Sequence, residues 1–471
     1  MSQAIGRVLQ NCRKWLMPFA FCTAGAASFA LFYLGLAYVE NPVREYGFII
    51  VSVIAAVLTG LNFLYLVFKE KKVSVWRIIV LFGVLALFFA CFAIWYLNFG
   101  TKGELVSRAE QFAVFGVSAL LAGVCVAAWE TEHEAFANLE AVAFFYVPAA
   151  LIYVNGALLR CSPFNGGHNL GIINYMSFSY ALLPVLLSLL FRFSEKAELR
   201  FPFTKYSFKR PQLVRGLMIA LFWIAIIAAG TRGTYFCVAI FCICWAFSSF
   251  IHKEPEKKRV LGLSAAMITV LLFNVFVYAP SGMAVGRMDM FVEGIKNGEI
   301  VTAKQSEEIT KDVIDALVEE NSGGQLINRK EDSQDAEFLE ESIGAHNYKI
   351  GNRGTLYKLA WREFLKSPVT GMGPGGYAVK YGMYPHNAIL EILCETGIVG
   401  GVLFLGMTVW AVIRLLMIGA KRKDCRWAVL FLIAFAVEAN ISGSLWNCPA
   451  LMFALGYGIV CPRVKENLPV K

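Results

Sequence analysis

Charge is scarce in this chain of 471 residues: only 16% are Asp, Glu, Lys or Arg, whereas 58% are hydrophobic. A soluble domain carries about 25% charged residues, so the composition excludes an ordinary soluble fold. The net charge of +9 comes mainly from short loops between apolar runs, and not from one basic domain. We therefore expect no nucleic-acid partner.

Several catalytic signatures are also missing. The sequence contains no phosphate-binding Walker loop, no His-Glu-x-x-His zinc motif and no Gly-x-Ser-x-Gly nucleophile elbow. The polar segment 281–385 contains no cysteine, and most cysteines elsewhere lie in apolar runs, where a thiol behaves as a small hydrophobe. We accordingly expect no metal and no cofactor.

Apolar runs of about 20 residues are abundant, and that length matches the thickness of a bilayer core. They predict an all-α polytopic membrane protein with about twelve transmembrane helices. The first run is too long for a cleavable signal peptide, so we expect none. The runs are 15–39, 46–68, 76–97, 111–128, 141–158, 173–191, 213–230, 233–251, 260–279, 388–418, 427–441 and 446–461.

Basic loops orient these runs. If every run crosses once, the basic clusters fall on one side, which the positive-inside rule makes cytoplasmic. The loop 129–140 is acidic and disagrees, but acidic residues weigh little in orientation. Both termini are then inside. The predicted parts are helices one to nine in 1–279, an extracytoplasmic loop in 280–386 and helices ten to twelve in 387–471.

The long outer loop is predicted to be partly helical. Residues 302–320 carry apolar side chains at helical spacing, and residues 355–366 read as a second short helix that ends before Pro368. Closely spaced glycines between 371 and 376 then mark a tight loop that leads to the tenth apolar run.

Three outer-side residues are candidates for chemistry: Arg232 between runs seven and eight, Arg353 at the start of the second loop helix, and His386 where the loop meets run ten. Taken singly, each has a structural explanation, such as a snorkelling arginine or a histidine in a helix-opening turn. Together, two guanidiniums can bind a diphosphate, and a neutral imidazole can deprotonate a hydroxyl. We expect the three side chains to converge on one outward-facing cavity.

Over residues 213–418 the chain resembles the O-antigen ligase and O-antigen polymerase superfamily of bacterial membrane glycosyltransferases. That resemblance departs at Tyr357, where the family more often has Trp, and the segment 297–345 has no part in it. The residues that carry it are Arg232, Arg353, Tyr357, Pro368, Gly371, Gly373, His386, Asn387, Glu395, Gly397 and Gly400.

The resemblance implies a multi-pass protein of the bacterial inner membrane whose active site faces outside. It implies transfer of a glycan from undecaprenyl diphosphate to an acceptor hydroxyl without a metal. Its partners would be that lipid-linked donor, a glycan or lipid-linked acceptor, and membrane lipids.

The same resemblance implies roles for single residues. His386 would be the catalytic base, Arg232 and Arg353 would bind the diphosphate, and Asn387 and Glu395 would support them. The proline and the glycines at 371 and 373 would be structural. Those at 397 and 400 would let helices approach closely.

Alternatives stay open at this stage. The motif describes donor handling, so it does not separate a polymerase from a ligase. A slight lean to the polymerase comes from the acceptor-facing loop, which has no distinctive feature. A transporter for an anion or a lipid-linked glycan is the rival class, and a structural scaffold is a third reading. Transporters tend to have broken helices and polar sites at mid-membrane, whereas here the polar residues cluster at the outer edge, which favours the enzyme.

Overall fold

The structure is a computed structural model. It describes residues 3–36, 42–98, 102–159, 173–195, 198–276 without 203 and 205, 353–381, and 384–461 without 421, 423 and 424. The predicted helix at 302–320 therefore lies outside the described residues. Within them, the named elements are all helical, and Arg200 and Ser207 form an isolated antiparallel bridge.

Each of the twelve apolar runs coincides with a helix. In chain order these are α2 (Leu16–Tyr33), α3 (Pro42–Tyr65) with η2 (Leu66–Glu70), α4 (Val75–Asn98), η3 (Phe112–Val117) with α6 (Ser118–Trp129), α7 (Glu132–Leu159), α8 (Tyr175–Glu195), α9 (Pro211–Ala229), α10 (Arg232–Ile251), α11 (Lys257–Phe276), α17 (Ala388–Gly419), α18 (Arg426–Ile441) and α19 (Pro449–Val460).

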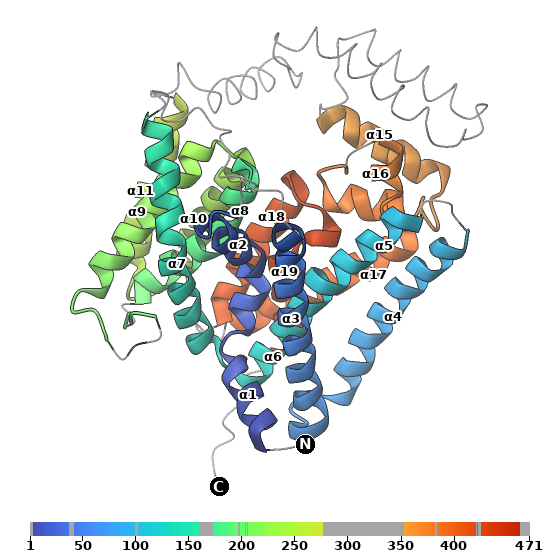
Figure 1. The fold of residues 1–471 in the computed structure, drawn as a ribbon, viewed down its shortest axis with the longest axis horizontal. Helices are drawn as coiled ribbons and strands as arrows, with labels where there is room; N and C mark the ends of the chain where they lie inside the picture. Colours follow the sequence, from blue (N-terminus) through green and yellow to red (C-terminus); the bar gives the residue numbers. More distant parts are fainter. Residues whose placement is uncertain are drawn as a thin grey trace.

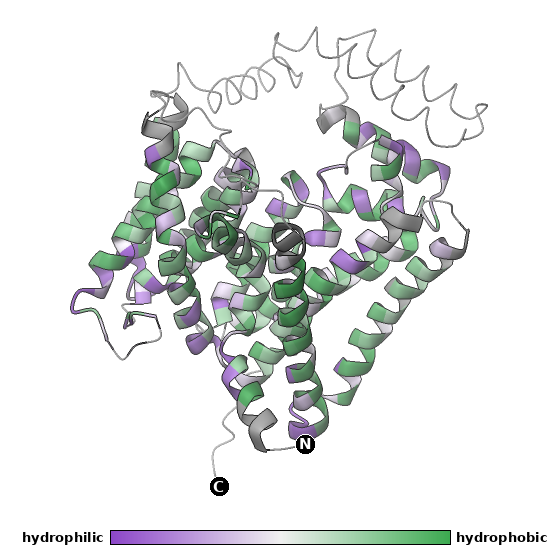
Figure 2. Cartoon of the chain, in the orientation of Figure 1, coloured by the Kyte–Doolittle hydropathy of each residue, from purple (hydrophilic) through white to green (hydrophobic). Residues whose placement is uncertain are grey.

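Eight of the described helical segments are long and apolar enough to cross a membrane. Figure 2 shows their hydrophobic bodies, with polar residues concentrated towards the helix ends. The chain is thus a polytopic helical membrane protein, as the sequence predicts. A total of twelve crossings stays a prediction, as do the three-part division of the chain and its orientation.

The remaining helices lie outside the apolar runs. They are α1 (Gln3–Arg13), α5 (Lys102–Gln111), α15 (Arg353–Lys366), α16 (Gly376–Tyr381) and the short 3-10 helix η7 (Leu445–Asn447). The second predicted loop helix is confirmed as α15. Figure 1 shows α15 and α16 at one end of the molecule, with α1 at the other.

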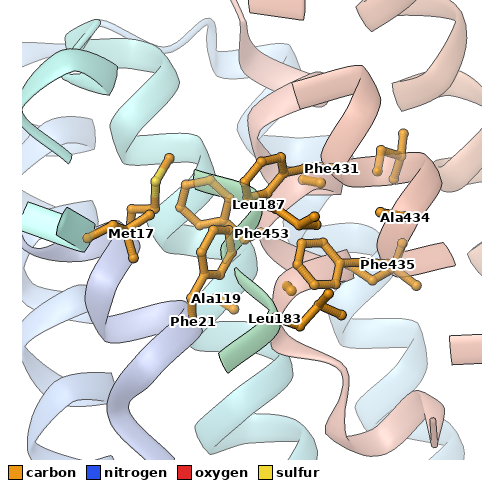
Figure 3. Packing of buried hydrophobic residues seen from close by; sticks show 14 of the residues in the cluster. Met17, Phe21, Ala119, Leu183, Leu187, Phe431, Ala434, Phe435 and Phe453 are labelled. Atoms are coloured by element: carbon orange, nitrogen blue, oxygen red, sulfur yellow. The ribbon is translucent and has the colours of Figure 1, made fainter. Parts of the chain in front are cut away.

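Aromatic rings fill the centre of the bundle. Phe21 of α2 lies against three rings from two C-terminal helices: Phe431 and Phe435 of α18, and Phe453 of α19, with its ring centroid 4.8 Å from that of Phe453 (Figure 3). The first and last apolar helices are therefore packed together in the core.

Helices α6 and α19 cross at very short distance. A Cβ atom at Gly123 would overlap the carbonyl of Phe453, and one at Gly456 would overlap the carbonyl of Leu120. Small residues at such a crossing let two membrane helices approach backbone to backbone.

Loops that are predicted to share the inner side do contact one another. Arg426 pairs with Glu254 at 2.6 Å, and Arg259 donates to the carbonyl of Ser194 at 2.9 Å. The acidic loop also finds its partners there, because Glu140 pairs with Arg215 at 2.6 Å and Glu130 lies 3.6 Å from Arg422. Two glutamates of this loop are thus paired with basic residues of neighbouring segments on the predicted inner side.

Candidate functional site

The N-terminal end of α17, which is the outer end in the predicted topology, is joined to residues 440–447, the connection between α18 and α19 that contains η7. We call this segment the 440–447 loop. Asn387 Nδ2 donates to the carbonyl of Asn440 at 3.2 Å, and the Ile389 backbone N–H donates to the Asn440 side chain at 3.3 Å. Two segments more than 50 residues apart in sequence therefore form one surface around His386.

His386 lies in the turn that opens α17, as its position between Pro385 and Asn387 predicts. Its φ is +56°, a left-handed conformation that few residues other than glycine adopt. The imidazole ring lies 4.1 Å from the Tyr384 ring, and its Nδ1 is 3.5 Å from the Ser442 carbonyl oxygen. Tyr384 donates its hydroxyl to the same oxygen at 3.0 Å. The Ser442 carbonyl thus orients both rings.

Asn387 is the N-cap of α17. Its side-chain oxygen accepts a hydrogen bond from the Leu390 backbone N–H at 2.9 Å, which satisfies one of the free donors of the first turn. Its amide nitrogen meanwhile reaches Asn440. One side chain therefore both begins the helix and ties it to the 440–447 loop.

Two buried carboxylates, Glu391 and Glu395, occupy successive turns of α17. Glu391 accepts hydrogen bonds from the Ser444 hydroxyl at 2.8 Å and from the Leu445 backbone N–H at 2.6 Å. Glu395 accepts one from the indole N–H of Trp446 at 2.7 Å. The two carboxylates thus fix the second half of the 440–447 loop against the helix.

Glu395 also holds the glycine-rich segment, because it accepts a hydrogen bond from the Gly375 backbone N–H at 2.8 Å. Trp446 packs edge-on against Phe92 of α4 and Phe112 of η3. The site is therefore bounded by N-terminal helices as well as by C-terminal ones.

Helix α17 is broken at Gly397, whose φ of 65° and ψ of −163° are not helical. The break would leave the carbonyls of Cys394 and Glu395 without helical donors, but the backbone N–H groups of Met372 and Gly373 donate to them, each at 2.8 Å. In return, Ile398 donates to the Pro368 carbonyl at 2.8 Å. The glycine-rich segment therefore enters the break and restores its backbone hydrogen bonds.

The glycines of the motif act at this junction. A Cβ at Gly371 would overlap the backbone of Glu395, and one at Gly397 would overlap the Val369 carbonyl. The expectation that Gly397 and Gly400 let helices approach closely stays a prediction. The neighbour of Gly397 is loop backbone, and that of Gly400 is the Thr396 side chain of the same helix. The glycine-rich segment and the Glu395–Gly400 stretch of α17 therefore meet at the break in the helix.

Broken helices at mid-membrane are typical of transporters. The depth of the break in α17 therefore bears on the choice between a transporter and an enzyme. The part from Ile398 to Gly419 is by itself about 33 Å long at 1.5 Å per residue. A bilayer core is about 30 Å thick, so this part alone can cross it. The break and both carboxylates then lie near the edge of the bilayer that is outer in the predicted topology.

Helices α15 and α16 are packed on the outer end of α17. The buried Tyr377 donates its hydroxyl to the Leu356 carbonyl at 2.9 Å, and burial raises the pKa of this phenol well above its usual value. Glu363 accepts hydrogen bonds from the Tyr381 hydroxyl at 2.8 Å and from the Lys366 ammonium at 3.1 Å. These contacts fix α15, and with it the backbone of Arg353, its first residue.

Arg232 is the first residue of α10. The side chains of Arg232 and Arg353 lie outside the part of the chain that the structure describes, so their convergence with His386 stays a prediction. The backbone next to Arg232 is close to the site, because a Cβ at Gly233 would lie 3.2 Å from the Ser442 hydroxyl. Ser442 thus has the start of α10 near its side chain and His386 at its carbonyl.

Sequence reasoning missed Glu391, Trp446 and the whole 440–447 loop. Two signals were available. Glu391 is an acid inside an apolar run, where a charge is costly and usually functional. The stretch from Asn440 to Asn447 joins two short apolar runs and is itself rich in polar residues, with one glycine.

The fold and the site define a polytopic membrane protein with a histidine and buried carboxylates gathered where two chain segments meet at one end of a broken span. Residues 217–405 match the family model described as O-antigen ligase. No curated protein and no solved structure matches the chain.

Residues 217–405 therefore match an O-antigen ligase domain, which confirms the resemblance of this region to the O-antigen ligase and polymerase superfamily. The match contains Arg232, Arg353 and His386, and it ends before α18 and the 440–447 loop. It supports a membrane enzyme that transfers glycan, with a lipid-linked donor.

Proposed function

We propose that this protein transfers an oligosaccharide or polysaccharide from undecaprenyl diphosphate to an acceptor hydroxyl at the outer face of the inner membrane. The observation that carries the proposal is His386, held by the Ser442 carbonyl at the outer end of α17 and inside the region that matches the family. The buried carboxylates that fix the neighbouring loops give this histidine a rigid frame.

In the proposed step, His386 takes the proton of the acceptor hydroxyl while the hydroxyl oxygen attacks the anomeric carbon of the donor sugar. The bond between that carbon and the diphosphate oxygen breaks, and undecaprenyl diphosphate leaves with the bonding electrons. Attack from the side opposite the leaving group inverts the configuration. A diphosphate is already a good leaving group, so the step needs no added metal.

The proposal assigns one ring nitrogen to this task. A carbonyl oxygen can only accept a hydrogen bond, so the contact between Nδ1 and the Ser442 carbonyl favours the tautomer in which Nδ1 carries the hydrogen. Nε2 is then unprotonated and is the base. The Ser442 carbonyl thus fixes the tautomer of His386 through Nδ1, as hydrogen-bond partners of catalytic histidines generally do.

Arg232 and Arg353 are proposed to bind the diphosphate. Each begins a helix, α10 and α15 respectively, and helix N-termini favour anions through their free backbone N–H groups. A guanidinium adds two parallel hydrogen bonds to phosphate oxygens, which a lysine ammonium cannot supply in the same geometry.

Replacing His386 tests the proposal most directly. We expect His386→Ala to lower glycan transfer by about 10²- to 10⁴-fold, the usual contribution of a general base. The matched control is His252→Ala, because His252 is exposed where α10 ends, on the opposite side of the membrane in the predicted topology. Transfer is measured in membranes that contain the lipid-linked donor, per amount of folded protein.

If His386→Ala transferred glycan at the wild-type rate, the proposed mechanism would be wrong. Arg232→Lys and Arg353→Lys provide a second test, since each keeps the charge and removes the bidentate geometry. We expect both to weaken donor use, with Arg200→Lys, an exposed arginine, as the neutral control.

A polymerase and a ligase differ in the acceptor, and surface glycans distinguish them. Deleting the encoding gene would leave single repeats attached to their final acceptor if the protein is a polymerase. Full-length chains stranded on the lipid carrier would identify a ligase. Of the two, we favour the polymerase.

A further inference from the structure

Helix α15 has an exposed face with two parallel ridges. Apolar residues Tyr357, Trp361 and Leu365 recur every four positions along one ridge, and Lys358, Arg362 and Lys366 follow each of them on the next. Residues four apart lie on the same side of a helix, so the two ridges run side by side. Trp361 and Leu365 are 48% and 59% exposed.

The opposite face of α15 is already used. Leu356, Leu359, Ala360 and Phe364 are buried in a small cluster with Tyr377 and Cys394. The exposed apolar ridge is therefore not the face through which α15 packs on the rest of the protein. It is a second apolar surface, and α15 has both.

This ridge continues onto the outward surface of α17. Val369, four residues after Leu365, is 61% exposed, and its carbonyl accepts a hydrogen bond from Val399 at 3.3 Å. Val402, on the next turn of α17, is 64% exposed. From there the exposed apolar residues of α17 follow its length as Val409, Ile413 and Met417. In a spanning helix such a face contacts lipid, so the ridge of α15 extends a lipid-facing surface.

The side chains have the chemistry of a membrane–water interface. Tryptophan and tyrosine concentrate at that depth because they combine an apolar ring with a polar group. Lysine and arginine beside them place apolar stems along the acyl region and direct their charge towards lipid phosphates. Helices with an apolar ridge next to a basic one bind anionic leaflets by both contributions.

We propose that α15 is an interfacial anchor, with Trp361, Leu365 and Val369 immersed in the outer leaflet and its basic ridge at the level of the lipid phosphates. The segment would thus be part of the membrane surface and not a water-exposed loop helix. This inference does not depend on the reaction. It has a consequence for the reaction, because α15 begins at Arg353 and the anchor holds that residue near the depth at which a lipid diphosphate lies.

The test uses the protein in nanodiscs made with phospholipids brominated near the headgroup end of their acyl chains. Bromine quenches tryptophan only on contact, and the difference in emission between the wild type and Trp361→Phe isolates Trp361. We expect most of the Trp361 emission to be lost in brominated nanodiscs, and little to be lost to aqueous iodide. Trp427→Phe is the control, because Trp427 is buried in the core and its emission should resist both quenchers.

Quenching of Trp361 by iodide alone would place the ridge in water and overturn the proposal. Resistance to both quenchers would also overturn it, since another part of the chain or a partner protein would then cover the ridge.

A second measurement keeps the proposal testable if Trp361→Phe folds poorly. Leu365→Cys and Lys366→Cys place thiols at adjacent exposed positions on the two ridges. A membrane-impermeant maleimide added from outside should label Lys366→Cys much faster than Leu365→Cys, with labelling followed on the peptide that contains the new cysteine. Equal rates would contradict immersion of the apolar ridge.

Discussion

Buried carboxylates occur on both sides of this protein, and they are bound in different ways. On the inner side, Glu140 is paired with Arg215 through two hydrogen bonds of 2.6 and 3.1 Å, and Arg192 lies 3.6 Å away. On the predicted outer side, the donors to Glu391 and Glu395 among the described residues are a hydroxyl, an indole and backbone N–H groups.

The difference suggests that the inner carboxylate stabilises the fold, whereas the outer carboxylates position the loops of the candidate site. The inner cluster compensates its charges internally, as a buried ion pair must. The outer carboxylates hold loops through neutral donors, so among the described contacts they do not take up the guanidiniums that the proposed diphosphate needs. Removing charge should therefore affect stability on one side and transfer on the other.

The largest effect is expected from Glu140→Ala. It leaves the buried Arg215 without its carboxylate, and breaking a buried pair in this way costs about 3–5 kcal/mol of unfolding free energy. Glu198→Ala, at an exposed pair with Arg200, should leave the unfolding free energy almost unchanged, because water screens such a pair. Both are measured by denaturant titration in mixed micelles. A change in transfer per folded molecule would contradict the purely structural role.

On the outer side, Glu391→Ala should show the opposite pattern. The Ser444 hydroxyl and the Leu445 N–H lose their acceptor, and the loop that positions His386 through Ser442 is loosened. A displacement of about 1 Å can cost about 100-fold in rate, so we expect a loss of that order in kcat with donor KM little changed. Glu391→Gln, which keeps one acceptor oxygen, should recover part of it. Equal losses in kcat and in donor affinity would indicate a general structural role.

The break in α17 offers a comparison within one helix. Gly397→Ala should cost at least about 2 kcal/mol, because its backbone conformation is nearly restricted to glycine and a side chain would overlap Val369. Gly406→Ala lies further along α17 with no atom near the added group, and should change stability by under about 1 kcal/mol. Similar thermal unfolding of the two variants would mean that the loop does not enter the break.

The smallest effect comes from two serines that each donate to a buried or half-buried glutamate. Ser444 donates to Glu391 at 2.8 Å on the outer side, and Ser249 donates to Glu254 at 3.0 Å on the inner side. Losing either bond should cost about 1 kcal/mol of stability. Only Ser444→Ala should also lower transfer, by about fivefold if the same energy is lost in the transition state. A fall in both variants would remove the distinction between the two sides.

Prediction from the sequence succeeded where the cause is local. Long apolar runs had to be helices, since a bilayer leaves backbone groups no other partner, and α15 follows from its own spacing and from Pro368. The place of His386 follows from Pro385 and Asn387, which define a helix start. The outer cluster was largely missed because its bonds join α17 to residues 51–56 positions away.

Gly397 illustrates the limit. From the sequence, Gly397 is expected to be a small residue that lets helices approach closely. No local pattern indicates that a loop from residues 368–373 replaces helical hydrogen bonds there. The acidic loop 129–140 is similar: its sequence opposes the orientation rule, and only the neighbouring Arg215 and Arg422 explain its place.

Hydropathy and motif spacing are properties of short segments, so the sequence alone predicts a helical membrane protein, with a resemblance to the O-antigen ligase superfamily that the match over residues 217–405 supports. Only the tertiary structure decided how His386 is held, that α17 is broken and repaired by a loop, and that Glu391 and the 440–447 loop belong to the site. Those features depend on hydrogen bonds between distant segments, which exist only once the helices have packed.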